Sequence, residues 1–74
     1  MNVTVYSKNN CPACEATKKQ LDAQGTEYSV VNIEDDDTGF EKVIEMGYNQ
    51  VPVVVSSRFG SWSGHQPAKL LSLK

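Results

Sequence analysis

Two cysteines stand three positions apart in the segment Cys11-Pro12-Ala13-Cys14, and the 74-residue chain has no others. Residues three apart share one face of a helix at roughly 5–6 Å from each other, which is inside the usual window for a disulfide. A disulfide between them would close a very short loop, and such a loop adds little chain-entropy stabilisation. The pair therefore predicts reversible thiol–disulfide chemistry rather than a structural crosslink.

The helix that is expected to begin at Pro12 gives the two cysteines different roles. Unpaired backbone N–H groups and the helix dipole favour an anion at a helix N-terminus, and a thiolate is such an anion. Pro12 suits the first helical position, and Lys8 upstream adds positive potential. We expect Cys11 to ionise more readily than a free thiol and to attack, and Cys14 to resolve the mixed disulfide.

A zinc site is the main alternative for this pair. Structural zinc usually takes four ligands. Besides the two cysteines, the chain has only one other cysteine or histidine side chain, His65. A metal would therefore need ligands from a second subunit, and we predict no metal. We also predict no cofactor, because the electrons pass through disulfide exchange. His65 alone is most often a surface or hydrogen-bonded residue, and it is assigned no catalytic role.

Length and composition restrict the class of protein. Residues 1–74 are enough for a single domain, and a net charge of −2 argues against a nucleic-acid binder. No apolar run approaches the ~20 residues that cross a bilayer, and the segment from Met1 to Tyr6 does not resemble a signal peptide. We expect a monomer in a reducing cytoplasm, where two closely spaced cysteines favour redox chemistry.

The pattern of apolar residues predicts the order βαβαββα. Strands are predicted at 2–6, 27–33, 51–55 and 59–62, and helices at 12–24, from a capping box at Thr38 to about Met46, and from about Pro67. The first βαβ unit requires parallel strands with a right-handed crossover, whereas the last two strands form an antiparallel hairpin. The expected class is α/β, a mixed four-stranded sheet flanked by three helices.

Three expectations concern side chains outside the cysteine pair. The second helix carries an apolar face, formed by Phe40, Val43, Ile44 and Met46. The acidic run 34–37 complements the dipole at the start of that helix. Trp62 has small polar neighbours in the sequence, so we expect it to be partly exposed and to suit a contact surface.

Three segments, in order and spread over nearly the whole chain, resemble the glutaredoxin-like NrdH redoxins of the thioredoxin superfamily. They are Tyr6-Ser7-Lys8 leading to Cys11-Pro12-Ala13-Cys14, Gly47-Tyr48-Asn49-Gln50-Val51-Pro52-Val53-Val54, and Trp62-Ser63-Gly64. The resemblance implies a thioredoxin fold with the cysteine pair between the first strand and the first helix. It also implies a cis Pro52, a Val51 backbone that pairs with a bound peptide or thiol, and a partner-binding surface at Trp62, Ser63 and Gly64.

The resemblance further implies a role as an electron carrier. Electrons would pass from NADPH through thioredoxin reductase to a class Ib ribonucleotide reductase. The chain departs from the family after Gly64, because His65, Gln66 and Pro67 stand where Phe-Arg-Pro is common.

Two alternatives remain open. A glutathione-dependent glutaredoxin of the same fold usually holds the amino end of glutathione with a carboxylate or hydroxyl just after this glycine. Here His65 and Gln66 leave that site incomplete, although Lys8 and the Val51 backbone could still serve it. The other alternative is a non-catalytic binding module whose cysteines are incidental or bind a metal.

Overall fold

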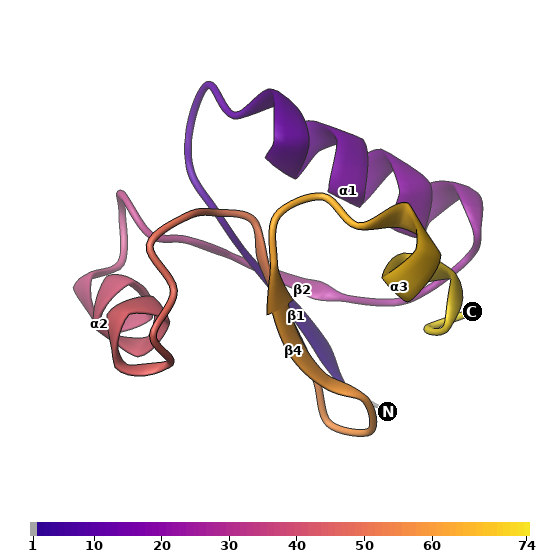
Figure 1. Ribbon diagram of the computed structural model, residues 1–74. Helices are drawn as coiled ribbons and strands as arrows, with labels where there is room; N and C mark the ends of the chain where they lie inside the picture. The colour runs from indigo at the N-terminus through magenta and orange to yellow at the C-terminus, as the bar shows by residue number, and fades with distance from the viewer. Residues whose placement is uncertain (1) are drawn as a thin grey trace.

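A four-stranded mixed sheet crosses the middle of the molecule in the computed structural model, which describes residues 2–74 (Figure 1). The strands are β1 (Val3–Ser7), β2 (Ser29–Asn32), β3 (Val53–Ser56) and β4 (Gly60–Ser63). The helices are α1 (Pro12–Ala23), α2 (Asp37–Glu45) and α3 (Pro67–Leu71). The predicted element order and the thioredoxin-type α/β fold are confirmed.

The strands lie in the order β2-β1-β3-β4. β1 pairs in parallel with β2, with Val5 opposite Val30, and α1 forms the crossover between them. β1 pairs antiparallel with β3, with Val5 opposite Val54, and β3 forms the predicted antiparallel hairpin with β4. The central strands β1 and β3 therefore end beside the loops that carry the cysteines and Pro52.

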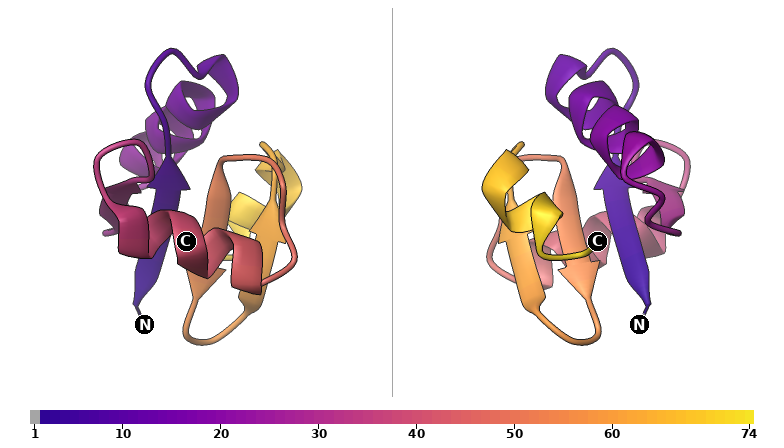
Figure 2. Two further views of the ribbon diagram at one scale, coloured as in Figure 1. Left: turned by 90° about the vertical axis from the view of Figure 1, so that its left-hand side faces the viewer. Right: turned by 90° about the vertical axis from the view of Figure 1, so that its right-hand side faces the viewer.

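The helices cover the two faces of the sheet unequally. Figure 2 shows α2 alone in front of the strands in one view, and α1 with α3 on the opposite face in the other. The core under α1 and α3 consists of Val3, Val5, Leu21, Val54, Trp62, Leu70 and Leu73. The core under α2 is smaller, with Tyr6, Val43 and Val53 as its buried members.

Trp62 is buried, which corrects the expectation of a partly exposed contact residue. Its side chain is only 5% exposed, within the core under α1 and α3. Trp62 stands opposite Val54 in the hairpin, and the neighbours that cover it, such as Val3 and Leu70, come from distant parts of the chain. The small polar residues beside it in the sequence therefore gave a misleading impression of its surroundings.

The start of α2 also differs from the prediction. Asp36, rather than Thr38, is the N-cap, and its carboxylate accepts a hydrogen bond from the backbone N–H of Gly39 at 3.0 Å. This agrees with the expected role of the acidic run, because an N-terminal carboxylate complements the helix dipole.

The apolar face of α2 is mostly uncovered. Of the four apolar residues predicted for this face, only Val43 is buried. Phe40 is 50% and Ile44 53% exposed, and Met46, the C-cap residue that follows α2, is 38% exposed. Gly39 brings the helix close to the sheet, because a Cβ there would lie 2.5 Å from the Val31 side chain. A short helix resting on Gly39 and Val43 leaves its flanks in solvent.

Candidate redox site

The first turn of α1 is built around the sulfur of Cys11. Cys11 is the N-cap, with extended backbone angles (φ −121°, ψ 98°), and its Sγ accepts a hydrogen bond from the backbone N–H of Cys14 at 3.1 Å. Pro12 occupies the first helical position, where its missing N–H costs nothing. A sulfur thus takes the place of the usual capping oxygen, and the same N–H would stabilise a thiolate there.

Cys11 and Cys14 form a disulfide with their Cα atoms 5.2 Å apart. Cys11 retains 7% of its surface, whereas Cys14 is completely buried. A disulfide between residues of one helical turn can open and close with little backbone movement. Of the two sulfurs, Cys11 is therefore the one that an incoming group reaches.

The turn before Cys11 is held by a network that the sequence analysis did not identify. The backbone N–H of Asn9 donates to Glu34 Oε1 at 2.6 Å, and the side-chain amide of Asn32 donates to Asn9 Oδ1 at 3.0 Å. Asn10 adopts a left-handed conformation (φ 55°), which asparagine tolerates better than most residues. The Asn9-Asn10 pair was the available sequence signal, because both residues favour turns.

The Val51-Pro52 loop lies against the cysteine pair. The peptide bond between the two residues is cis, as the family resemblance implied, and the Val51 carbonyl oxygen lies 3.9 Å from Cys11 Sγ. A disulfide sulfur has no proton to donate, so in this oxidised form the approach is a contact. The structure thus brings together Cys11, Cys14, Val51 and Pro52.

Ser63 and Gly64 fasten this loop. The Ser63 hydroxyl donates to the Gln50 carbonyl at 3.0 Å, and the Gly64 N–H donates to the Pro52 carbonyl at 2.8 Å. Gly64 has φ +85°, a backbone conformation that residues other than glycine rarely adopt. These two residues, which the resemblance placed at a partner surface, hold the loop beside the cysteines through their hydrogen bonds.

The residues that depart from the family pattern are also bonded within the chain. His65 Nδ1 lies 2.9 Å from the hydroxyl of Thr17, a fully buried residue one turn after Cys14 on α1. The Gln66 amide donates to the Ser63 carbonyl at 2.8 Å. His65 therefore connects the loop before α3 to α1, which agrees with its interpretation as a hydrogen-bonded residue.

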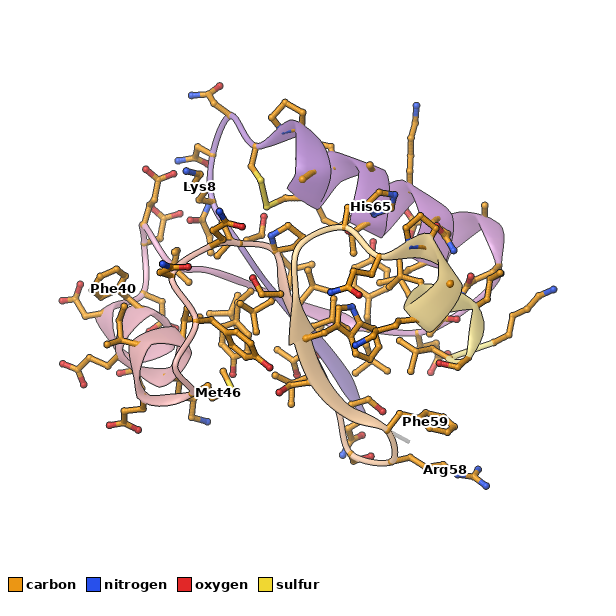
Figure 3. All side chains as sticks on the ribbon, in the orientation of Figure 1. Lys8, Phe40, Met46, Arg58, Phe59 and His65 are labelled. Atoms are coloured by element: carbon orange, nitrogen blue, oxygen red, sulfur yellow. A yellow bond between two sulfur atoms is a disulfide. The ribbon has the colours of Figure 1, made fainter. Side chains whose placement is uncertain are left out.

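A groove of about 230 Å³ adjoins the cysteine pair on the α2 side. Its lining residues are Lys8, Ile33, Phe40, Val43, Ile44, Tyr48, Asn49, Gln50 and Val51. Figure 3 shows Lys8 on the side of the disulfide and Phe40 at the outer edge of α2. Val51 belongs to both the groove and the redox site, so the two are continuous.

A wider surface depression of about 890 Å³ lies away from the cysteines, near the C-terminal end of α1. Tyr28 in this depression donates from its hydroxyl to Asp22 Oδ1 at 2.9 Å. Partial burial, together with the neighbouring Asp22 carboxylate, raises the pKa of Tyr28 to about 12. The depression contains no cysteine. A shallower hollow of about 480 Å³, lined by Asn10, Cys11, Pro12 and Glu15, opens at the reactive cysteine itself.

Residues 2–74 contain neither a cluster of metal-binding side chains nor a membrane-spanning helix. No three or more His, Cys, Asp or Glu side chains gather in a way that would hold a metal ion. Within the same residues, no helix has the length and apolar character needed to cross a membrane.

The Glutaredoxin family model matches residues 3–58 of the chain. The glutaredoxin-like protein NrdH of Lactococcus lactis subsp. cremoris is 42% identical over 71 residues, which cover 96% of this chain and 97% of that protein. The NrdH protein of Salmonella typhimurium is 36% identical over 67 residues, covering 90% of this chain and 82% of the relative.

Solved structures agree with these relatives. The NrdH-redoxin of Escherichia coli, described as having a thioredoxin-like activity profile, superposes with a TM-score of 0.94 at 31% identity, over 100% of this chain and 96% of that one. A buckwheat glutaredoxin in complex with glutathione shares the fold, with a TM-score of 0.73 at 23% identity over 96% of this chain and 74% of that one. The chain therefore belongs to the glutaredoxin family, among the glutaredoxin-like NrdH redoxins, and its cysteine pair makes it a thiol–disulfide oxidoreductase.

Proposed function

We propose that this redoxin delivers electrons to a class Ib ribonucleotide reductase and is recharged by thioredoxin reductase. The observation that carries the chemistry is the hydrogen bond from the Cys14 N–H to Cys11 Sγ, at 3.1 Å. It supports Cys11 as the thiolate, because a backbone N–H at a helix start favours negative charge on the sulfur. The NrdH names of the relatives support the choice of partner.

The proposed reaction begins with the reduced pair. The Cys11 thiolate attacks one sulfur of a substrate disulfide, so an S–S bond forms between them and the second substrate sulfur leaves as a thiolate. Cys14 then loses its thiol proton and attacks Cys11 Sγ, which forms the Cys11–Cys14 disulfide and releases the first substrate sulfur as a thiolate. Two electrons have moved to the substrate, and both of its sulfurs take up protons from water.

The roles follow the accessibility of the two sulfurs. Cys11 is the only one of the pair with exposed surface, and it lies against the Val51 carbonyl at 3.9 Å. Cys14, fully buried and one turn along α1, reaches only the sulfur of Cys11. We assign attack to Cys11, resolution to Cys14, and positioning of the bound substrate to Val51 and Pro52. Lys8 supplies positive potential at the edge of the site.

A redoxin that donates electrons must itself be kept in the dithiol form, and a reducing compartment favours that form. The proposal therefore assigns the protein to the cytoplasm, with no bound cofactor.

Glutathione-dependent reduction is the second candidate, and the match to the Glutaredoxin model favours testing it. Two observations weigh against it. After Gly64 the chain offers no carboxylate, and the side chains of His65 and Gln66 already bond to Thr17 and to the Ser63 carbonyl. A group that holds the amino end of glutathione is therefore missing at the position where related glutaredoxins provide one.

The decisive experiment follows NADPH oxidation with a class Ib ribonucleotide reductase as the electron acceptor. One reaction contains thioredoxin reductase, and a parallel reaction contains glutathione with glutathione reductase. We expect turnover in the first and background oxidation in the second. Turnover in the glutathione reaction alone would contradict the proposal. Turnover with a general protein disulfide but none with the reductase would exclude the proposed partner while leaving the oxidoreductase chemistry in place.

A further inference from the structure

We propose that His65 is a positioning residue that holds the Val51-Pro52 loop at a fixed place beside Cys11. The inference rests on the proposed function, because it concerns how this loop places a substrate disulfide for attack. It begins from the hydrogen bond between His65 Nδ1 and the hydroxyl of Thr17, at 2.9 Å. Figure 3 shows the side chain of His65 beside α1, the helix that carries Thr17.

The Thr17 side of this hydrogen bond is rigid. Thr17 lies within α1 and is fully buried, and among residues 2–74 its hydroxyl has no other hydrogen-bond partner. A buried hydroxyl that loses its partner is costly, because water cannot replace the lost bond. Cys14 stands three residues earlier on the same face of α1. Thr17 therefore anchors His65 one helical turn from the redox pair.

Gly64 passes this position on to the loop. It directly precedes His65, and its N–H donates to the Pro52 carbonyl at 2.8 Å. The Val51 carbonyl oxygen in turn lies 3.9 Å from Cys11 Sγ. The contacts form a closed ring, which leaves α1 at Cys11, runs through the loop and returns to α1 through His65.

Neighbouring hydrogen bonds between α1 and the C-terminal segment bypass the loop. Gln20 Nε2 donates to the Pro67 carbonyl at 3.0 Å, and Gln24 Nε2 donates to the Leu70 carbonyl at 2.7 Å. Both fasten α3 to the end of α1 that lies farther from the cysteines. Of these three bonds, the one at His65 is therefore the bond that can set the position of the loop.

The geometry assigns the effect to attack rather than to resolution. A substrate disulfide that bonds to the Val51 backbone is misplaced when the loop moves relative to Cys11. Resolution takes place within one turn of α1, where the Cα atoms of Cys11 and Cys14 are 5.2 Å apart. Loss of the His65 bond should therefore slow the attack by Cys11 and leave the resolution by Cys14 unchanged.

The test measures the two steps separately, with a synthetic peptide whose one cysteine is joined to pyridinethiol in a disulfide. The Cys11 thiolate bonds to the peptide sulfur, and the pyridine sulfur leaves as a thiolate whose absorbance gives the rate of attack. Cys14 then loses its proton and bonds to Cys11, and the peptide leaves as a thiolate. Mass spectrometry of quenched samples gives the rate of this resolution. Alkylation of Cys11 by iodoacetamide, which needs no contact with the loop, is the internal control.

Thr17→Val and His65→Leu each remove the hydrogen bond. Both should lower the rate constant of attack about fivefold, as expected for one lost hydrogen bond, with resolution and alkylation unchanged. The double variant should be no slower than either single variant, because both changes remove the same bond. His65→Asn should restore the rate, since the asparagine amide places a hydrogen-bonding atom as many bonds from Cβ as Nδ1. Gln20→Ala is the matched control and should attack at the wild-type rate.

The outcomes separate this inference from the proposed function. Thermal unfolding of each variant sets a temperature at which all of them are folded, and the rates are compared there. Wild-type attack in His65→Leu, equal slowing in Gln20→Ala, or no recovery in His65→Asn would overturn the positioning role while the oxidoreductase activity stands. Alkylation that slows in parallel with attack would also overturn it, because the bond would then act on the Cys11 thiolate. Failure of the wild-type protein to attack the peptide would overturn the inference and the proposed function together.

Discussion

The Glu34 carboxylate accepts a hydrogen bond from the backbone N–H of Asn9 at 2.6 Å, across 25 residues of sequence. Asn9 lies two positions before Cys11, and Glu34 follows β2, so the bond joins the turn that presents the reactive sulfur to the neighbouring edge of the sheet. The solvent-exposed carboxylate of Glu34 therefore fixes the backbone of the turn at the redox site.

Glu34→Ala should loosen this turn. We expect a loss of about 1 kcal/mol in the free energy of unfolding, because the exposed N–H of Asn9 regains water in place of the carboxylate. Urea denaturation measures the loss, and the rate of Cys11 alkylation in the reduced protein reports the turn itself. Asp35→Ala is the control, since that side chain makes no hydrogen bond within residues 2–74. Equal effects of both changes would refute the role of Glu34.

Exchanging Cys14 for serine separates attack from resolution. Cys14→Ser retains the Cys11 thiolate, so it should still form a mixed disulfide with a substrate but should not release it. Intact mass spectrometry would detect the trapped adduct, and turnover in the NADPH assay should fall to background. Cys11→Ser should form no adduct. An adduct on Cys14 in the Cys11→Ser protein would reverse the assigned roles.

Gly64→Ala tests the loop that holds Pro52. Gly64 has φ +85°, and a Cβ there would have nothing within 4 Å, so the cost is conformational rather than steric. An alanine in the left-handed region should lower the free energy of unfolding by about 1–2 kcal/mol, as measured in urea. Gly60→Ala at the hairpin is matched in conformation, with φ +83° and the same open space.

The two glycine variants should differ in activity. Only Gly64 donates its N–H to the Pro52 carbonyl, at 2.8 Å, so only Gly64→Ala should also slow substrate reduction. The comparison uses conditions in which both proteins are fully folded. Similar rates for both would mean that the Gly64 bond does not position the loop for catalysis.

The raised pKa of Tyr28 predicts that the folded protein loses stability at alkaline pH. Its pKa is raised to about 12 in the folded chain, first by burial and then by the Asp22 carboxylate, against about 10 in an unfolded one. The unfolded state therefore releases the proton first, and stability should fall as the pH rises from about 10 to about 12. Because the pair is exposed to solvent, the loss should be about 1 kcal/mol or less.

Denaturation in urea at several pH values would measure this decline, and Tyr28→Phe should make it shallower. Spectrophotometric titration of tyrosine at alkaline pH provides an independent check. A titration of Tyr28 near pH 10 in the folded protein would contradict the expected shift.

The sequence predicted the order of elements and the central redox pair, because both depend on local patterns. Polar–apolar alternation marked β1, a run of valines marked β3, and the C-x-x-C spacing at a helix start located Cys11 and Cys14. Strand ends shifted by one or two residues. For example, β1 extends to Ser7, whereas the prediction ended at Tyr6.

The errors arose where distant contacts decide the environment. Trp62 is covered by residues from β1 and α3, which neighbouring positions in the sequence could not reveal. The exposure of Phe40 and Ile44 depends on how α2 sits on the sheet, and the close approach at Gly39 has no local signature. The cis bond before Pro52 came from the family resemblance, since single-sequence reasoning favours trans.

The unequal covering of the two sheet faces has a consequence for amide hydrogen exchange. α2 packs on the sheet through little more than Gly39 and Val43, and the side chains of Phe40 and Ile44 are about half exposed to solvent. Segments with few buried contacts open in local fluctuations that leave the rest of the protein folded. We expect the amides of α2 to exchange well before those of β1 and β3.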